Sequence, residues 1–269
     1  MNPKLSIILP GIRKDNWFKF YESVIDSFDG TFEVVIVSPY DRLPEELRDI
    51  ENIVHIKDLG SPARCQQIAL VNCTGEFVTW GADDGYFLPN KLTEAVKYWE
   101  DNAASPIDIV TCKYFEGEKN QQGVLHSTGE TELSQDFYYK LNNAAGLRSA
   151  FIPDDYWILN VGILKTAYAK ALGGWDSMFE VTAVSHADFA VRTQRNGSKY
   201  HMLPEPIFTC THMPGTTGDH APVHYGHVMH DEPLFRKIYQ SAQGISRTKI
   251  NINNWQQSPP VWKRRYGDV

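Results

Sequence analysis

The sequence predicts an α/β protein: a Rossmann-like, mixed but mainly parallel sheet flanked by helices, with a loop-rich C-terminal segment. Strand and helix patterns alternate through residue 100, which is typical of right-handed βαβ units. The first two strand patterns are continuous apolar runs, as expected for strands covered on both faces. A later strand runs into two adjacent carboxylates, and open α/β sheets bind ligands at the carboxyl ends of their strands. We therefore expect a platform for a nucleotide.

The first half of the chain contains the alternating elements. Large apolar residues recur at helical spacing from Trp17 to Phe28. A second helix pattern runs from Ser61 to the Thr74-Gly75 break, and a third runs from Leu92 to Trp99. Strand patterns lie between them, over residues 5–10, 33–38, 54–59 and 76–80.

The second half is more irregular. Strand patterns over residues 108–115 and 124–127 flank a polar loop and predict a hairpin. Helix patterns from Leu164 to Leu172 and from Phe189 to Thr193 are each followed by glycine. A last strand pattern covers residues 200–211, and little periodicity follows it.

Composition limits the classes of partner. The 269 residues are 42% hydrophobic, enough for one large α/β domain. A net charge of −7 argues against binding to nucleic acid, and the basic cluster Lys263–Arg265 is short enough to be a solvated tail. No apolar run approaches the roughly 20 residues that span a bilayer, although peripheral contact with a membrane stays open.

A cytoplasmic location is expected. The first strand pattern begins directly after the N-terminus, without the features of a secretory signal peptide. The four cysteines have no CxxC spacing, so we interpret them as reduced thiols rather than as zinc ligands. The sequence predicts no particular oligomeric state.

An acidic turn follows the strand pattern over residues 76–80. It reads Gly81-Ala82-Asp83-Asp84-Gly85. Hard divalent cations that carry phosphates prefer oxygen ligands, and they often take only one or two from the protein. The turn therefore predicts a cation site, although an ordinary Asp-Asp-Gly turn would contain the same residues.

Four segments, in this order, resemble the family 2 glycosyltransferases with the GT-A fold. They are LSIILPGIRK, SPARCQQIALVNCTGEFVTWGADDGYFLPNKL, NVGILKTAYAKALGGWDSMFE and HADFAVRTQRNG. The second is similar to the family's A-R-N and D-x-D-D motifs, and the last two to its G-G-(W/F)-D-x-x-F and D-(apolar)-x-x-R patterns. The resemblance implies inverting transfer of a sugar, by a single displacement, from a nucleoside diphosphate sugar (a UDP-sugar by default). The implied acceptor is a hydroxyl of a glycan or another molecule, and the implied cofactor is Mn²⁺ or Mg²⁺.

The resemblance also implies how the chain is divided. Residues 1–215 would form a single GT-A domain, with a nucleotide-sugar-binding half over 1–105 and an acceptor half over 106–215. Residues 216–269 would form a flap or tail over the site. The stretch from Pro214 to Gly226 is rich in glycine and histidine, which predicts a lid that closes over the donor.

On the donor side, the resemblance implies binding by residues of the first turn, the second strand, the A-R-N motif and the acidic turn. These are Pro10, Gly11, Arg13, Ser38, Arg64, Asp83 and Asp84. It implies a metal site at Asp83, with Asp84 helping to hold either the metal or the ribose, and with His212 completing the metal shell. His212 could instead be an ordinary loop histidine, and Arg64 an arginine on a helix surface.

On the acceptor side, the base is predicted to be Asp188, with His186 as the alternative. The two side chains point roughly 200° apart on a helix, so only one of them faces the cleft. Asp188 could also form a simple i,i+4 pair with Arg192, and His186 has the intrinsic pKa better suited to a base at neutral pH. Acceptor-wall candidates are Trp157, Trp175 and Asp176, and for the tryptophans core packing is the alternative.

Three departures from the family pattern leave other functions open. Gly81 replaces the first Asp of D-x-D-D, Ser38-Pro39 replaces the acidic end of the second strand, and Ser185-His186 replaces a Glu-Asp pair. A degenerate member that binds nucleotide or sugar without transfer is therefore one alternative. A nucleotidyltransferase is another, but the turn after the first strand lacks the glycine-rich basic loop expected for that class.

Overall fold

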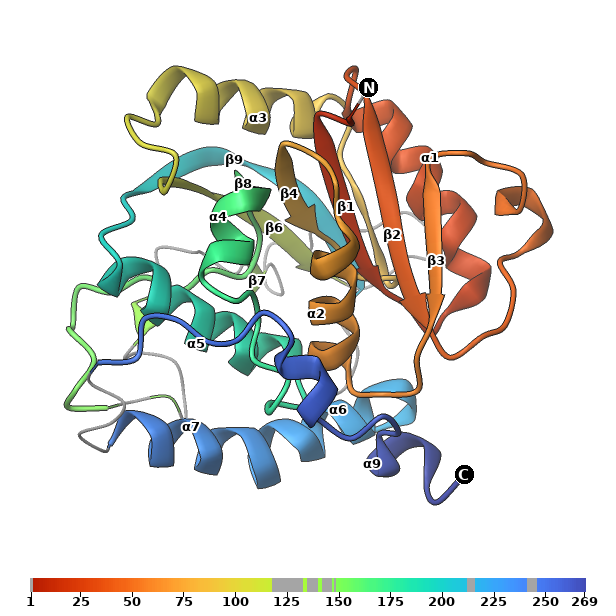
Figure 1. The fold of residues 1–269 in the computed structure, drawn as a ribbon. Helices are drawn as coiled ribbons and strands as arrows, with labels where there is room; N and C mark the ends of the chain where they lie inside the picture. Colours follow the sequence, from red (N-terminus) through yellow and green to blue (C-terminus); the bar gives the residue numbers. More distant parts are fainter. Residues whose placement is uncertain are drawn as a thin grey trace.

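The structure is a computed structural model that describes residues 2–117, 133–134, 140–141, 147, 149–211, 216–240 and 246–269. One mixed sheet crosses the molecule in the order β3-β2-β1-β4-β8-β6-β9-β5, with β7 beside β6 (Figure 1). β1 pairs in parallel with β2 and β4, whereas β8 is antiparallel to both of its neighbours. The predicted mixed α/β sheet is thereby confirmed. The strands are β1 Leu5–Pro10, β2 Phe32–Ser38, β3 Ile53–Lys57, β4 Phe77–Trp80, β5 Gly85–Phe87, β6 Ile109–Gly117, β7 Leu133–Ser134, β8 Gly162–Lys165 and β9 Tyr200–Thr211.

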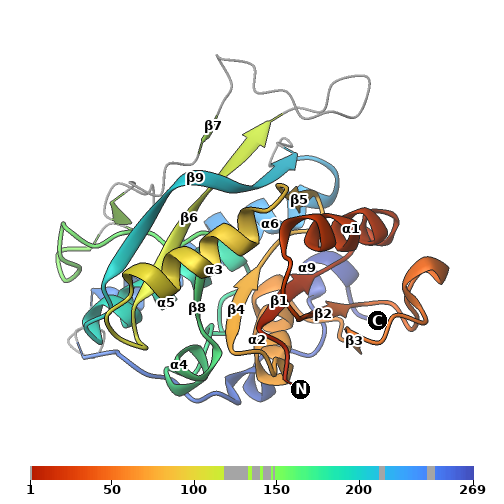
Figure 2. The same cartoon turned by 90° about the horizontal axis from the view of Figure 1, so that it is seen from above.

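Helices cover both faces of this sheet (Figure 2). Because successive side chains of a strand point to opposite faces, β1 contributes to two cores. Leu5, Ile7 and Leu9 pack with α1 and α3, and Ile8 packs with α2, α4 and α5. These helices are α1 Trp17–Ser27, α2 Pro62–Asn72, α3 Lys91–Asn102, α4 Thr166–Ala171 and α5 Thr182–Arg195.

The segment after β9 contains more helix than its weak periodicity suggested. Phe235 and Tyr239 of α7 are fully buried in a third core with Val184 and Val191 of α5. Tertiary packing therefore stabilises this short helix, in which Leu234, Phe235, Ile238 and Tyr239 share one face. The elements here are the 3₁₀ turn η4 Gly218–His220, α6 Ala221–Gly226, the π-helical turn η5 His227–Asp231, α7 Glu232–Tyr239, the 3₁₀ turn η6 Asn254–Gln257 and α9 Lys263–Tyr266.

Short elements account for the other differences from prediction. Leu164 lies in β8, so the helix expected from this residue begins only at Thr166. β5 was not predicted; it begins at Gly85, the last residue of the expected turn, and pairs with β9 in antiparallel orientation. Two 3₁₀ turns, η1 Lys14–Asn16 and η2 Glu45–Leu47, follow β1 and β2. The predicted strand over residues 124–127 lies outside the described residues.

In the part of the chain that the structure describes, no helix is long and apolar enough to cross a membrane.

Candidate functional site

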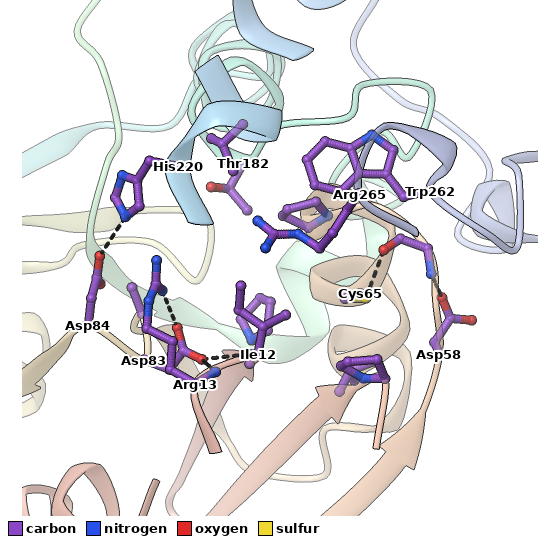
Figure 3. A pocket seen from close by; sticks show the side chains of 18 of the residues that line it. Ile12, Arg13, Asp58, Cys65, Asp83, Asp84, Thr182, His220, Trp262 and Arg265 are labelled. Atoms are coloured by element: carbon purple, nitrogen blue, oxygen red, sulfur yellow. Dashed lines mark hydrogen bonds and ion pairs between the residues drawn. The ribbon is translucent and has the colours of Figure 1, made fainter. Parts of the chain in front are cut away.

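Two adjoining cavities lie where β1, β2 and β4 end. Their volumes are about 180 Å³ and about 330 Å³, and we call them the first and the second cavity. They share part of their lining, namely Pro10, Gly81, Ala82, Asp84, Thr182 and His220. The first cavity, seen in Figure 3, is also lined by Gly11, Ile12, Arg13, Pro39, Asp58, Gly60, Pro62, Cys65, Asp83, Trp262, Arg265 and Tyr266. The second is also lined by Gln66, Trp80, Tyr114, Asn160, His186, Phe208 and Cys210.

Asp83 anchors the turn between β1 and α1. Its carboxylate accepts the backbone N–H of Ile12 at 2.5 Å, the backbone N–H of Arg13, and the Arg13 guanidinium at 2.7 Å. Its backbone oxygen accepts from the Asn16 amide at 2.7 Å. With its side chain only 3% exposed, Asp83 has both oxygens engaged within the protein. This geometry differs from the prediction, which made Asp83 the principal metal ligand.

Asp84 has one carboxylate oxygen that accepts no hydrogen bond from the described residues. Oδ2 lies 3.5 Å from Nε2 of His220, while the buried Oδ1 has no hydrogen-bond partner among the described residues. A buried carboxylate oxygen without a donor is costly, and a cation would satisfy it. Within the described residues no group of three or more His, Cys, Asp or Glu could hold a metal ion by itself. His212, the predicted third ligand, lies outside these residues.

The missing first aspartate of the acidic turn has a steric cause. A Cβ built at Gly81 would lie 2.7 Å from the ring of Phe20 and 3.3 Å from that of Phe208. Any side chain larger than that of glycine would therefore require these aromatic rings to move. The rings of Phe20 and Phe208 occupy the space that an aspartate side chain would need.

The predicted donor residues separate into two groups. Pro10, Gly11 and Arg13 line the first cavity, but Ser38 and Arg64 do not. Ser38 is fully buried, with its hydroxyl 2.8 Å from Nε2 of His55. Arg64 lies behind the wall, where it pairs with Asp58 at 3.0 Å and donates to the carbonyl oxygen of Ser258 at 3.1 Å. It therefore supports the cavity from behind, through Asp58 and the C-terminal segment.

The start of α5 brings His186 to the second cavity. Asp231 fixes the chain just before this helix by accepting the backbone N–H groups of Glu180 at 2.9 Å and Val181 at 2.7 Å. The His186 ring lies beside Trp80, with centroids 5.2 Å apart, and its Nε2 is 2.8–3.0 Å from the side-chain amide of Gln66. Burial lowers the pKa of His186 to about 3, so the imidazole is neutral at neutral pH.

Asp188 points away from both cavities. It is fully buried, and its carboxylate accepts from Arg192 at 2.8 Å, Arg247 at 2.9 Å and the Tyr239 hydroxyl at 2.6 Å. Burial opposes its ionisation, but the charges of Arg192 and Arg247 outweigh it and lower the pKa of Asp188 to about 2. As predicted, only one of the two α5 side chains faces the cleft. The structure presents His186 there, whereas the sequence favoured Asp188.

None of the predicted acceptor-wall residues lines either cavity. Trp175 is fully buried, with its ring centroid 5.0 Å from that of Trp80, which is core packing. Asp176 is 2% exposed and pairs with Arg247. Trp157 is bonded through its backbone to Gln194 and has the ammonium of Lys140 3.4 Å from its ring centroid.

Some lining residues gave a signal that the sequence analysis did not use. Trp80 is the last residue of a predicted strand, a position that would place it at the ligand-binding edge of the sheet. Arg265 belongs to the basic cluster interpreted as a solvated tail. That interpretation is wrong, because Arg265 is only 14% exposed and lines the first cavity, and Arg264 pairs with Glu180 at 2.7 Å. Trp262 gave no pattern that would have placed it there.

The strand order defines an α/β fold that has its two cavities at the carboxyl ends of β1, β2 and β4, the edge at which open α/β sheets bind ligands. Solved structures of S. aureus TarS, a family 2 glycosyltransferase with the GT-A fold, are similar to this chain. TarS 1–349 has a TM-score of 0.55 at 17% identity, covering 91% of this chain and 70% of that one. The complex of TarS 1–349 with UDP has a TM-score of 0.55 at 18% identity, and the match covers 89% of this chain and 67% of that one. The complex with UDP-GlcNAc has the same TM-score and identity, and the match covers 89% of this chain and 68% of that one. The predicted GT-A fold is thereby confirmed. No protein-family model and no curated protein matches the sequence.

Proposed function

We propose that this protein is a glycosyltransferase that moves a sugar from a nucleoside diphosphate sugar, a UDP-sugar by default, to an acceptor hydroxyl. The observation that carries the proposal is the shared wall of the two cavities at Asp84, Thr182 and His220. A nucleotide in the first cavity would direct its sugar towards the second, where His186 lies. The similarity to TarS structures that contain UDP and UDP-GlcNAc supports this class of donor.

The first cavity suits a nucleotide for two reasons. The turn of Gly11 to Arg13 is fixed by Asp83, so the backbone beside the bound ligand is preorganised. The opposite wall combines apolar surface, including Trp262, with the carboxylate of Asp58. Small-molecule sites commonly combine apolar walls with a few fixed polar groups.

The residues present fit a divalent cation at Asp84. Its free Oδ1 is the hard oxygen ligand that Mn²⁺ or Mg²⁺ prefers, and the donor phosphates would supply further ligands. A cation there would neutralise charge on the departing diphosphate. Asp83 would act indirectly, by fixing the turn, and His212 stays a candidate ligand.

His186 is the better candidate for the base. In the tautomer that donates Nε2–H to Oε1 of Gln66 at 3.0 Å, Nδ1 retains the lone pair that takes the acceptor proton. Asp188 would instead hold α5 in place through Arg192 and Arg247. A single displacement with inversion then needs no covalent intermediate on the enzyme.

A protein that binds donor without transferring its sugar is the second candidate. The low pKa of His186 favours it, because an imidazole with a pKa of about 3 is a weak base.

Two measurements test the proposal and separate the candidates. Calorimetric titration of UDP, with and without Mn²⁺, should give binding that the cation strengthens. Incubation with UDP-GlcNAc and other UDP-sugars should release UDP slowly in water and faster with the correct acceptor. Binding without any release of UDP would favour the second candidate. If neither UDP nor another nucleoside diphosphate bound, the proposal would be wrong.

A further inference from the structure

The last helix of the chain forms part of the wall of the first cavity. Val261 pairs in parallel with Leu59, just beyond β3, and the backbone N–H of Trp262 donates to the Leu59 oxygen at 2.8 Å. The indole of Trp262 is 4% exposed. The helical turn that contains Arg265 is completed by a hydrogen bond from the backbone N–H of Gly267 to the backbone oxygen of Lys263, at 2.8 Å. The backbone that carries Arg265 is therefore fixed, and its side chain extends into the cavity between Thr182 and Ile12 (Figure 3).

Asp219 lies between Arg265 and Arg13. Arg265 Nη2 donates to the backbone oxygen of Asp219 at 2.6 Å, and its Nη1 lies 3.8 Å from Oδ1 of the same residue. The other carboxylate oxygen, Oδ2, is 3.4 Å from Nε of Arg13. One carboxylate thus bridges two guanidinium groups that come from opposite ends of the chain and both line the first cavity.

The arginines near the first cavity, Arg13, Arg64 and Arg265, differ in how well their acidic partners are shielded from solvent. Arg64 is paired with Asp58, and Arg13 is paired with Asp83, whose side chain is only 3% exposed. The side chain of Asp219, the partner of Arg265, is 52% exposed. An ion pair with a well-solvated carboxylate contributes little net stability. A diphosphate presents more charge, and a planar guanidinium can bind two of its oxygens at once.

We propose that Arg265 binds the diphosphate of the donor, and that Asp219 takes the place of the phosphate oxygens on this guanidinium in the free protein. The inference rests on the proposed function and adds a donor-binding residue from the C-terminal helix. Donor binding exchanges a carboxylate of the chain for the diphosphate. Asp219 then becomes free of Arg265, together with the turn that carries His220.

The experiment compares affinities for UDP and for uridine, which lacks the phosphates. Arg265→Gln should weaken UDP binding by about tenfold to a hundredfold, the scale of charge-assisted hydrogen bonds, and leave uridine binding unchanged. Arg265→Lys should recover part of the loss. Asp219→Asn should strengthen UDP binding several-fold, because it removes the competing charge. The matched control is Lys263→Gln, which removes one positive charge from the same helix at a side chain that is 76% exposed; it should change neither affinity.

The outcomes are distinct. Equal weakening of UDP and uridine binding by Arg265→Gln would mean that Arg265 only supports the wall, and the inference would fall. It would fall equally if Arg265→Gln bound UDP like the wild type. In both cases UDP still binds the wild-type protein, so the proposed function survives. Wild-type protein that binds none of UDP, GDP, ADP, CDP and dTDP would instead overturn the proposed function and this inference with it.

Discussion

At the scale of single residues, two neighbouring aspartates have opposite surroundings. Asp83 is surrounded by donors from the β1–α1 turn, whereas Asp84 keeps a buried oxygen without a donor among the described residues. We therefore expect a stability role for Asp83 and, if the proposed function is correct, a ligand-binding role for Asp84. Identical substitutions at the two sites should therefore have different effects.

Asp83→Asn should destabilise the protein, and Asp84→Asn should weaken metal-dependent binding. The first replaces a carboxylate that accepts from two backbone groups and an arginine, so we expect the free energy of unfolding to fall by about 3 kcal/mol. The second removes a charge whose buried Oδ1 has no donor among the described residues, so it should not lower that free energy, and it should reduce the Mn²⁺-dependent affinity for UDP by about tenfold or more. Urea unfolding and calorimetry measure the two quantities. Full Mn²⁺-dependent UDP affinity in Asp84→Asn would contradict the assignment of the metal to Asp84.

His186→Ala should lower turnover by about 10² or more, the typical scale for a positioned base, with UDP affinity little changed. Asp188→Asn should act on stability instead, because it leaves Arg192 and Arg247 without their buried partner. Initial rates of transfer and urea unfolding of both variants separate these effects. If Asp188→Asn folded normally with turnover abolished while His186→Ala stayed active, the base would be Asp188, as the sequence first suggested.

The lowered pKa of His186 also predicts a pH dependence of stability. Its folded-state pKa of about 3 lies below the ordinary value of about 6.5, so the unfolded chain binds more protons between these values. This contribution is complete above about pH 6.5 and is lost as the pH falls, with a slope of up to about 1.4 kcal/mol per pH unit. Urea unfolding from pH 4.5 to 7 should give a steeper slope for the wild type than for His186→Gln. Parallel slopes would mean that His186 titrates normally.

At the scale of secondary structure, the sequence predicted best the elements that carry their own pattern. The apolar runs of β1 and β2 and the stripe of α1 are long enough to show their period. β5 and β8 have three and four residues and depend on partners distant in the chain, so no local pattern could reveal them. α7 does carry such a pattern, with Leu234, Phe235, Ile238 and Tyr239 on one face, but it spans only eight residues in a segment otherwise without periodicity, and it was missed.

The candidate site was predicted only in part, for a related reason. The acidic turn with Asp84 could be placed at the carboxyl edge of a parallel sheet from the strand pattern before it, and the resemblance added Pro10, Gly11 and Arg13. Side-chain direction was harder to predict. It places His186 in a cavity and Asp188, two residues later, in a buried ion-pair cluster. Contributions from the distant C-terminus, such as Arg265, have no local pattern at all.

The segment after β9 should become more ordered when the donor binds. Its described residues 216–226 include His220 and Val223, which line the first cavity, and many of its residues are partly or fully exposed. Active-site lids are commonly drawn from weakly packed segments of this kind. Hydrogen exchange of the backbone amides over residues 218–226 should slow when UDP and Mn²⁺ are added. Exchange in α3, far from both cavities, is the internal control. Unchanged exchange over residues 218–226 would argue against a lid.

At the scale of the whole molecule, the C-terminal segment contacts both α2 and α5 and also lines the first cavity. Residues 246–269 contact the end of α4 and then α2, and they continue to α9 (Figure 1), whose Arg265 lines the first cavity. Arg247 joins Asp188 of α5 to Asp176, and Gln67 of α2 donates to the oxygen of Ile252 at 2.7 Å. The position of Arg265 therefore depends on contacts made far from it. Docking of this segment should contribute to global stability as well as to the cavity wall.

A pair of glycines can isolate that contribution. Gly173 and Gly197 both have left-handed backbones, with φ of +88° and +86°. A Cβ at Gly173 would overlap the backbone oxygen of Ile250, whereas a Cβ at Gly197 would meet nothing within 4 Å. Alanine at either position pays about 1–2 kcal/mol for its backbone conformation, but only Gly173→Ala also pushes the C-terminal segment away.

We therefore expect Gly173→Ala to lower the free energy of unfolding by about 1–3 kcal/mol more than Gly197→Ala, the usual cost of an added group in a packed site. Urea unfolding of the two variants measures this difference. Because Ile250 precedes the residues that position α9, Gly173→Ala should also weaken UDP binding, while Gly197→Ala should not. Equal losses of stability and equal UDP affinities in the two variants would show that the segment can move aside freely, and that its docking does not shape the cavity.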